Sequence, residues 1–559
     1  MSELDGLSFE LVLPEIMMLG GLLVMILIPN IGDARMRLPL TSIRVPILLG
    51  GARFKMTSDP RLPNAIALAT FVFSLAASSY MLLEGTSGDV GEVLRVDQFS
   101  SLMSVIFTSA LLLVTVATIH RIPSSPGAQA PGQEDSVAAE EKKIATLYDN
   151  RRQVDFHILL LMAGLGMSLM AKSTHLFMLF VCLELASLSS YVLVGFHKET
   201  DIGGEAGTKY FIVGSVASAA GIYGMSLLYL WNGDLSIAGL SSSWEAMEAM
   251  DPFAIIGVGL MLVAFGFKVG AAPFHLAIPD AYSGASSPVA GLLATASKAM
   301  GFVALMRVLL VVTMPSAGEA FWFAIIAGIS VITMTWGNLA ALSSDNPKRI
   351  LAYSSVAHAG YMLAALAAVG TGMGSADLVL TAVLFHLTVL VLFKLGSFLV
   401  LSILETEGGS HRLGGLHGLA RRDPIVACSM FVFVLSLAGV PPFSGFLSKL
   451  LMINGIVGLT AGTGSLSGAA ILSWATSVNP AFWLAVAIVL NSALSLFYYL
   501  RMGLVMFFEA PEDVSPVRVA NPLRAAIALC AVLTVLLGIG PLSEAALDLV
   551  SGAADAFLS

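Results

Sequence analysis

Long runs of apolar residues, separated by short polar or charged stretches, form the main pattern along this chain. Each run is roughly 16 to 25 residues long, and an α-helix needs about 20 apolar residues to cross the hydrocarbon of a bilayer. Within a run the apolar residues are continuous, whereas the strands of a membrane β-barrel alternate in polarity over about ten residues. The pattern therefore predicts an all-α polytopic membrane protein in which residues 1–559 form a single membrane domain.

The runs divide into about 14 predicted transmembrane helices. Their approximate ranges are 11–30, 62–83, 98–119, 156–171, 176–196, 210–231, 253–274, 287–312, 320–342, 351–369, 378–403, 425–456, 480–500 and 523–540. The stretch before the first range is acidic, and a cleavable signal peptide has a basic flank there. We therefore expect the first range to be a retained helix.

The composition changes between residues 121 and 155, where small residues, proline and mixed charges replace the apolar runs. Such a segment is typical of a mobile loop. It follows three predicted N-terminal helices within 1–120. The remaining helices divide into helices 4–8 at 156–312, helices 9–13 at 320–500 and a C-terminal helix at 523–559.

A five-residue pattern, Gly-x-x-Pro-Phe, occurs in the seventh range at 270–274 and again in the twelfth at 439–443. The copies lie five spans apart, and a repeat with an odd number of spans must be inverted in the membrane. Inverted repeats with paired interrupted helices are typical of transporters. We therefore predict inverted five-helix repeats, with helices 7 and 12 broken at Pro273 and at Pro441-Pro442. Irregular backbone at membrane depth is tolerated where it is buried or lines water, so both breaks are candidate pathway sites.

The charges support a membrane protein and predict its orientation. Only 12% of the residues are charged, against about 25% in a typical soluble domain. Lys and Arg favour cytoplasmic loops, and with the N-terminus outside, 21 of the 28 basic residues fall in inside loops. The outside loops hold only Arg95 and Lys172. We therefore predict a multi-pass protein of a prokaryotic cell membrane, with both termini on the outer face and 121–155 in the cytoplasm.

Five basic residues remain inside the predicted spans, where a charge costs roughly 2.5–3.5 kcal/mol on insertion scales. They are Lys268, Lys298, Arg307, Lys394 and Lys449. Glu184 is the one acid expected at depth, because Glu15 lies near the end of its range. Desolvation penalises the charged form of a lysine, so a lysine in apolar surroundings can exchange a proton near neutral pH. We therefore expect Glu184 and the four lysines to form a proton relay, unless the lysines extend to the interface, and we expect Arg307 to be an anchor.

Histidines and cysteines complete the candidate chemistry. His275, His358 and His386 lie near these lysines, and imidazole titrates near pH 7, so each is a further candidate for the relay or else a packing residue. Cys182, Cys428 and Cys530 are far apart and favour a packing role. The chain has no glycine-rich nucleotide loop, cysteine cluster or haem-like histidine pair. We therefore predict that it binds no cofactor and no metal.

Several segments together resemble the antiporter-like proton-channel subunits of respiratory complex I, most closely the N subunit. These segments are LPEI at 13–16, ELASLSSYVLVGF at 184–196, EAGTKYF at 205–211, FKVGAAPFHLAIPD at 267–280, YSGASSPVAGLLATASKAMGF at 282–302, NLAAL at 338–342, KRILAYSSVAHAGYML at 348–363 and PPFSGFLSK at 441–449. One segment departs from the N pattern. HLTVLVLFK at 386–394 is more similar to the sister M and L subunits, because typical N subunits lack its lysine.

The resemblance implies a proton-translocating subunit of a reductant:quinone oxidoreductase, whose quinone and reductant cofactors belong to the complex and not to this chain. Its partners would be other membrane subunits and the lipid bilayer, with no nucleic acid. The resemblance also assigns the relay in order. Glu184 and Lys268 would be the charge pair of the first half-channel, Lys209 and Lys298 would continue it, and His358 and Lys449 would lead to the exit.

Two alternatives stay open. The chain could be a subunit of a multisubunit cation/proton antiporter with the same fold, or a structural membrane subunit that does not pump. The opening Leu13-Pro14-Glu15-Ile16 favours the oxidoreductase over the antiporter. The presence of Glu184 together with the intramembrane lysines speaks against a purely structural subunit.

Overall fold

The computed structural model describes residues 9–27, 31–37, 44–48, 62–119, 150–313, 319–369, 376–406, 412–458, 480–510, 516–517 and 519–558. Most of the predicted linker at 121–155 lies outside these residues. In the described part, 12 helical spans are long and apolar enough to cross a membrane, and a bent helix pair would make 13. The prediction of an all-α polytopic membrane protein is confirmed.

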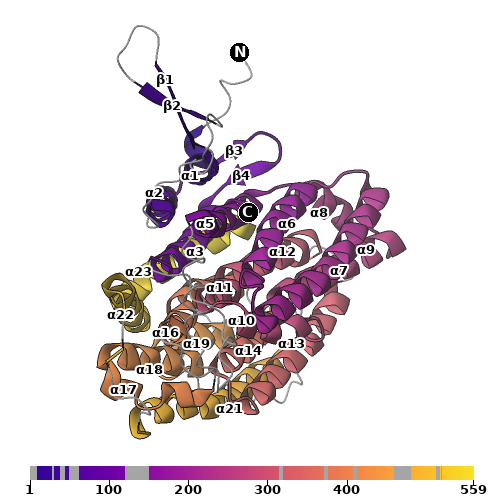
Figure 1. Ribbon diagram of the computed structural model, residues 1–559. Coiled ribbons are helices and arrows are strands. Elements are labelled where there is room, and N and C mark those ends of the chain that lie inside the picture. The colour runs from indigo at the N-terminus through magenta and orange to yellow at the C-terminus, as the bar shows by residue number, and fades with distance from the viewer. Residues whose placement is uncertain are drawn as a thin grey trace.

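The N-terminal and C-terminal helices pack together along one side of the molecule (Figure 1). The N-terminal elements are α1 (Leu13–Leu27), β1 (Ile31–Arg37), β2 (Arg44–Leu48), α2 (Leu62–Glu84), β3 (Gly88–Val90), β4 (Leu94–Val96), α3 (Gln98–Ala117) and α5 (Asn150–Lys172). The strands form two antiparallel hairpins, β1–β2 and β3–β4. The C-terminal helices α22 (Asn521–Leu536) and α23 (Pro541–Leu558) return to this side, where α23 contacts α3.

The other helices form two groups, which Figure 1 shows in magenta and in salmon to orange. The first group is α6 (Leu176–Val194), α7 (Asp201–Asn232), α8 (Ile237–Glu245), α9 (Pro252–Val269), α10 (Ile278–Gly284), α11 (Ser287–Leu292) and α12 (Lys298–Met306). The second is α13 (Glu319–Leu342), α14 (Pro347–Val369), α15 (Ala376–Leu390), α16 (Gly396–Thr406), α17 (Leu419–Arg422), α18 (Pro424–Ala438), α19 (Ser444–Val457) and α21 (Pro480–Phe508). π-Helical turns join α11 to α12 at Leu293–Ser297 and α15 to α16 at Val391–Leu395.

Helices α9 and α18 begin and end with the same local signals. Asp251 caps α9 and Asp423 caps α18, each accepting a backbone N–H bond, and a proline follows in the first turn of each helix. Each helix ends at a glycine with φ 83°, Gly270 after α9 and Gly439 after α18. Glycine adopts this left-handed conformation without the steric penalty of a Cβ atom, so both helices end where the sequence contains Gly-x-x-Pro.

Several helices extend beyond the predicted apolar ranges. Helix α7 begins at Asp201 and not at 210, because Thr200 caps it by accepting from the Gly203 N–H at 3.1 Å. Lys209, which the predicted topology assigned to a loop, therefore lies in a helix. Helix α5 begins at Asn150, so residues 150–155 belong to it and not to the linker. Hydropathy marks the apolar middle of a helix, whereas polar first turns continue the same hydrogen bonding.

The predicted single C-terminal helix at 523–559 is instead two helices. Helices α22 and α23 meet at an angle of 85°. Gly540 has φ 97° and directly precedes Pro541, which begins α23. Neither a left-handed glycine nor the proline after it continues a helix, so the break between α22 and α23 has a local cause.

Three spans are almost completely enclosed by the rest of the protein: Ser287–Val312, Pro347–Val369 and Ala376–Thr406. Polar residues on these spans face protein and not lipid. Helices α12, α14 and α15–α16 therefore provide an interior in which titratable groups can interact away from the lipid hydrocarbon.

Candidate functional site

The four intramembrane lysines all lie in the protein interior. Each is at most 8% exposed: Lys268, Lys298, Lys394 and Lys449. A lysine that extends to the membrane interface would keep its ammonium in contact with water. The burial of these side chains argues against that alternative, and each ammonium group has its partners inside the protein.

Glu184 and Lys268 approach each other through two hydroxyl groups. The Ser218 hydroxyl donates to Glu184 Oε1 at 2.6 Å, and Lys268 Nζ donates to the Tyr191 hydroxyl at 3.0 Å. The Tyr191 hydroxyl is in turn a side-chain hydrogen-bond partner of Ser218. Lys268 Nζ also lies 4.7 Å from the centre of the Tyr191 ring, a cation–π distance. Neither Tyr191 nor Ser218 was a candidate from the sequence, although Tyr191 lies within the recognised segment 184–196 and Ser218 follows the one at 205–211.

Lys298 and Lys394 meet adjacent residues of the enclosed helix α14. Lys298 Nζ donates to the Ser355 carbonyl, and Lys394 Nζ donates to the Ser354 hydroxyl. Both lysines lie at π-helical turns, since Lys298 directly follows Leu293–Ser297 and Lys394 lies within Val391–Leu395. Such turns add a residue to the helix and often occur at functional sites. Lys298 Nζ would also lie 4.0 Å from a Cβ atom built at Gly270, next to the end of α9.

A hydrogen-bonded row continues from Ser354 through two histidines. The Tyr499 hydroxyl is a side-chain partner of Ser354 and lies 3.5 Å from His358 Nε2. His358 Nδ1 lies 3.0 Å from His386 Nε2, with the two rings stacked at an interplanar angle of 13°. His386 Nδ1 lies 2.8 Å from the Ser448 hydroxyl. The structure thus joins His358 and His386 directly.

With both imidazole rings neutral, one arrangement of donors and acceptors is consistent with these hydrogen bonds. Ser448 donates its hydroxyl proton to the Gly445 carbonyl at 3.0 Å, so it accepts from His386 Nδ1–H. His386 Nε2 then accepts from His358 Nδ1–H, and His358 Nε2 accepts from the Tyr499 hydroxyl. From Tyr499 to Ser448 every donor points in the same direction, whereas the Ser354 hydroxyl donates to the Leu351 carbonyl at 2.9 Å. An imidazole accepts a proton on one nitrogen and releases another from its second nitrogen, so such a row can pass a proton along its length.

Lys449 lies at the interruption between α18 and α19. Its Nζ donates to the Leu437 carbonyl at 2.9 Å and to the Ala438 carbonyl at 3.1 Å, the last two residues of α18. These carbonyls have no intrahelical partner because the helix ends there. A Cβ atom built at Gly439 would lie 3.2 Å from Lys449 Nζ. The interruption between α18 and α19 at Pro441-Pro442 therefore leaves these two carbonyls available to accept from the Lys449 ammonium group.

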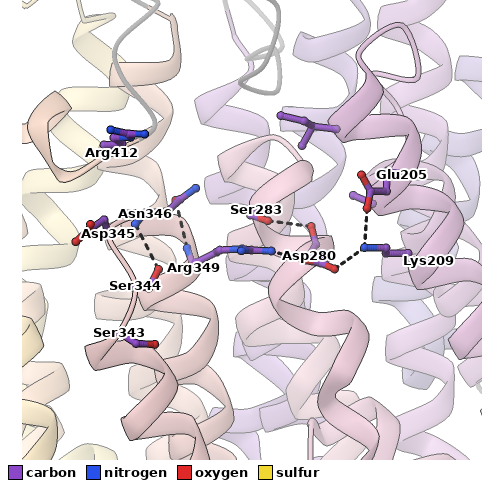
Figure 2. A pocket seen from close by; sticks show the side chains of 12 residues that line it. Glu205, Lys209, Asp280, Ser283, Ser343, Ser344, Asp345, Asn346, Arg349 and Arg412 are labelled. Atoms are coloured by element: carbon purple, nitrogen blue, oxygen red, sulfur yellow. Dashed lines mark hydrogen bonds and ion pairs between the residues drawn. The ribbon is translucent and has the colours of Figure 1, made fainter.

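Two predicted relay residues lie apart from this row. Lys209 is half exposed and pairs with Glu205 at 2.6 Å and with Asp280 at 2.8 Å, on the wall of a pocket of about 780 Å³. Figure 2 shows Lys209 and Arg349 reaching Asp280 from different helices. His275 is 5% exposed, and its Nδ1 has no hydrogen-bond partner among the described residues. Its ring faces Trp336, at a centroid distance of 6.3 Å, and no described contact joins it to a relay lysine.

Arg307 has the contacts of a structural anchor. Its guanidinium lies 5.4 Å from the centre of the Phe99 ring and 4.9 Å from that of Phe557. One of its nitrogens donates to the Ala171 carbonyl at 3.4 Å. These contacts join the first group of helices to α3, α5 and α23.

The expectation that Glu184 is the only deep acid is wrong. Glu15 is 4% exposed and pairs with Lys172 at 2.6 Å, and Glu405 pairs with the buried Lys348 at 2.7 Å. Sequence reasoning placed Lys172 and Lys348 in loops because each lies at the end of an apolar range. A long side chain at a helix end can point back into the protein, and hydropathy does not record that direction.

The chain shows extensive similarity to known membrane proteins. Residues 173–476 match the family described as NADH:quinone oxidoreductase/Mrp antiporter, TM. The NADH-quinone oxidoreductase subunit N of Heliobacterium modesticaldum is 34% identical over 453 residues, which cover 80% of this chain and 84% of that protein. The F(420)H(2) dehydrogenase subunit N of Methanosarcina mazei is 31% identical over 489 residues, which cover 85% of this chain and 88% of that protein.

Solved structures also resemble this fold. A chain of respiratory complex I from Thermus thermophilus has a TM-score of 0.69 and 28% identity, covering 96% of this chain and 98% of its own. A chain of the Mrp complex from a Dietzia species has a TM-score of 0.75 and 22% identity, covering 99% of this chain and 100% of its own. At that lower identity, the second similarity concerns the fold alone.

Proposed function

This chain belongs to the NADH:quinone oxidoreductase/Mrp antiporter family, in which it is an N-type subunit, and we propose that it carries protons across the membrane within a complex I-like quinone oxidoreductase. The observation that carries this proposal is the row of buried titratable groups. From Lys394 the row runs through Ser354, Tyr499, His358 and His386 to Ser448, next to Lys449. A purely structural subunit would have little reason to keep so many ionisable groups at membrane depth.

The proposed route has two parts that meet at α14. Glu184, Lys268 and Lys298 form the first part, and Lys394, the two histidines and Lys449 form the second. A proton on one lysine disfavours a proton on the next, so each transfer prepares the following site. Partner subunits would reduce the quinone and supply the energy, through conformational or electrostatic changes that reach Glu184. Lys209 and His275 lie apart from the row, and we place them outside the central transfer steps.

The inverted repeats and the count of 14 helices belong to the same proposal. Helices α18 and α19 are each too short to span alone. Together they would form the twelfth crossing, interrupted at Pro441-Pro442 as α9 is interrupted before Pro273. The shared Asp-Pro starts and Gly-x-x-Pro endings of α9 and α18 support the correspondence.

The orientation can be tested at the C-terminus. We expect a reporter enzyme fused after Ser559 to be active outside the cytoplasm, because basic residues gather in the loops assigned to the inner side. The measurement compares alkaline phosphatase and green fluorescent protein fusions, which work on opposite sides of the membrane. Fluorescence without phosphatase activity would contradict both the orientation and the even number of spans.

The absence of a cofactor is a separate prediction. We expect the purified subunit to show no stoichiometric absorbance from haem, flavin or an iron–sulfur cluster, because the sequence has no ligand cluster for them. The measurement is an absorbance spectrum with metal analysis on the isolated chain. A cofactor bound at one copy per chain would contradict the prediction.

The function itself is tested by proton pumping measured together with quinone reduction in membranes that carry relay variants, with assembly measured separately. The antiporter alternative makes a different prediction, since it requires cation exchange without quinone reduction. The two relatives described above, both over 30% identical, are N subunits of NADH-quinone oxidoreductase and of F(420)H(2) dehydrogenase, which supports the oxidoreductase. Neighbouring genes for quinone-reductase subunits would support it further, and genes for sodium-antiporter subunits would oppose it.

A further inference from the structure

A buried ion pair outside the proposed relay joins three structural elements. Lys348 Nζ, at the start of α14, pairs with Glu405 Oε1 of α16 at 2.7 Å and also donates to the Ala285 carbonyl. Glu405 Oε2 accepts from the Ser287 N–H at 2.9 Å, at the start of α11. Both charged side chains are at most 6% exposed. The carboxylate is thus held at the junction of α11, α14 and α16.

Farther along the same three spans lie the central lysines, Lys298 and Lys394, and the α14 serines that they contact. Lys348 and Ser355 are seven residues apart on α14, about 10 Å along the helix at 1.5 Å per residue. Ser287 precedes Lys298 by 11 residues, and Glu405 follows Lys394 by 11, each about 16 Å of helix. The Lys348–Glu405 pair and the Lys298–Lys394 contacts with α14 are therefore two polar layers in one enclosed bundle.

Hydroxyl groups lie between the two layers. Thr295 lies between Ser287 and Lys298 along the chain, and Ser402 lies between Lys394 and Glu405. The Tyr282 hydroxyl, from α10, is a side-chain partner of Ser355 in the deeper layer. These groups and water molecules can bridge a distance that is too long for direct proton transfer.

Residues close to the ion pair along the chain line the polar pocket of Figure 2. Asn346 and Arg349, which flank Lys348 on the chain, line this pocket. Ser283, two residues before Ala285, lines it as well. The pocket lies at the end of the bundle where the predicted cytoplasmic loops gather. The ion pair is therefore placed between a solvent-accessible cavity and the buried lysines.

We propose that Glu405, paired with Lys348, is the group that takes up protons from the cytoplasmic pocket and passes them to Lys298 and Lys394. This proposal rests on the proposed function and adds a residue to it. Glu405 accepts a proton from water in the pocket, which neutralises the carboxylate and leaves Lys348 as an unpaired cation held by the Ala285 carbonyl. The proton then passes to the free amine of a central lysine, and the ion pair re-forms.

A structural role for the pair makes a different prediction from a transfer role. Removing one member of a buried ion pair is costly mainly because it leaves the other charge unpaired, and replacing both members is often neutral or stabilising. If the pair only joins helices, Glu405→Gln is harmful and a second change at Lys348 repairs it. If Glu405 carries protons, the second change repairs assembly but not pumping.

The test uses the assembled complex in inverted membrane vesicles, with proton uptake followed by a pH-sensitive dye alongside quinone reduction and assembly. We expect Glu405→Gln, alone or combined with Lys348→Met, to lower proton pumping by roughly 100-fold, the usual effect of losing a positioned proton-transfer group. The matched control is Asp423→Asn. Asp423 is a buried carboxylate that pairs with the partly exposed Arg524 at 2.6 Å, and asparagine also serves as a helix cap. We expect this control to pump at the wild-type rate.

Wild-type pumping in assembled Glu405→Gln would overturn the proposal, and so would recovery of pumping in the double variant. If the single variant does not assemble, the double variant decides, because it leaves no unpaired buried charge. The proposed function is tested separately by variants of Lys268 and Lys449. If the Lys268 and Lys449 variants lose pumping while the Glu405 variants pump normally, the role proposed for Glu405 is wrong and the relay still stands. If all of these variants pump normally, the relay is wrong as well.

Discussion

Lys268→Arg is expected to abolish proton pumping, although it keeps a cation in the same position. The guanidinium of arginine does not release its proton in proteins, so a site that must lose and regain a proton stops working. We expect the pumping rate to fall by roughly 100-fold or more, the range for loss of a positioned proton-transfer group. The measurement is proton pumping with quinone reduction in membranes that carry the assembled variant.

The surroundings of Lys268 make this substitution informative. Lys268 Nζ donates to the Tyr191 hydroxyl at 3.0 Å, and Tyr191 leads through Ser218 to Glu184. Tyr191→Phe removes that hydroxyl and keeps the ring that faces the ammonium group at 4.7 Å. It therefore separates the hydrogen-bonded link from the packing of the side chain. An assembled Lys268→Arg variant that pumped normally would contradict a relay through Lys268.

Lys449→Ala is expected to block the far end of the relay while the complex still assembles. Lys449 follows Ser448, where the histidine row ends, and its ammonium group is held by the final carbonyls of α18. Removing it leaves no titratable group at this interruption, and we again expect a loss of roughly 100-fold in pumping. Pumping and quinone reduction are measured as before.

Two further variants interpret that result. Lys449→Arg keeps a donor for the Leu437 and Ala438 carbonyls but does not release its proton, so it is expected to fail as well. If arginine restored pumping, the lysine would be required only to satisfy these carbonyls, and the proposed exit would be wrong. Lys142→Ala, in the predicted linker outside the described residues, is the surface control and is expected to change nothing.

Local sequence features accounted for most of the helices. An apolar run of about 20 residues has one stable solution in a bilayer, because every backbone polar group must find its partner within the helix. The endings of α9 and α18 were equally local, since Gly270 and Gly439 precede prolines that cannot continue the helix. Errors occurred at polar helix ends, as at Lys209 and Lys348, where hydropathy changes before the helix does.

The deep lysines were also identifiable from the chain alone. A charge among apolar residues is costly wherever the helix packs, so Lys268, Lys298, Lys394 and Lys449 required an explanation before any contact was known. The histidines at 358 and 386 were recognised because imidazole titrates near pH 7 and both lie near these lysines. Their direct contact was not, because it depends on α14 and α15 packing side by side.

Partnerships between distant residues were decided by the tertiary structure. Tyr191 and Ser218 between Glu184 and Lys268, the pairing of Glu15 with Lys172, and that of Lys348 with Glu405 join separate helices. Polarity along a chain indicates that a buried charge needs a partner. The crossing of helices and the direction of each side chain determine which residue supplies it, and these follow from packing over the whole bundle and not from any local segment.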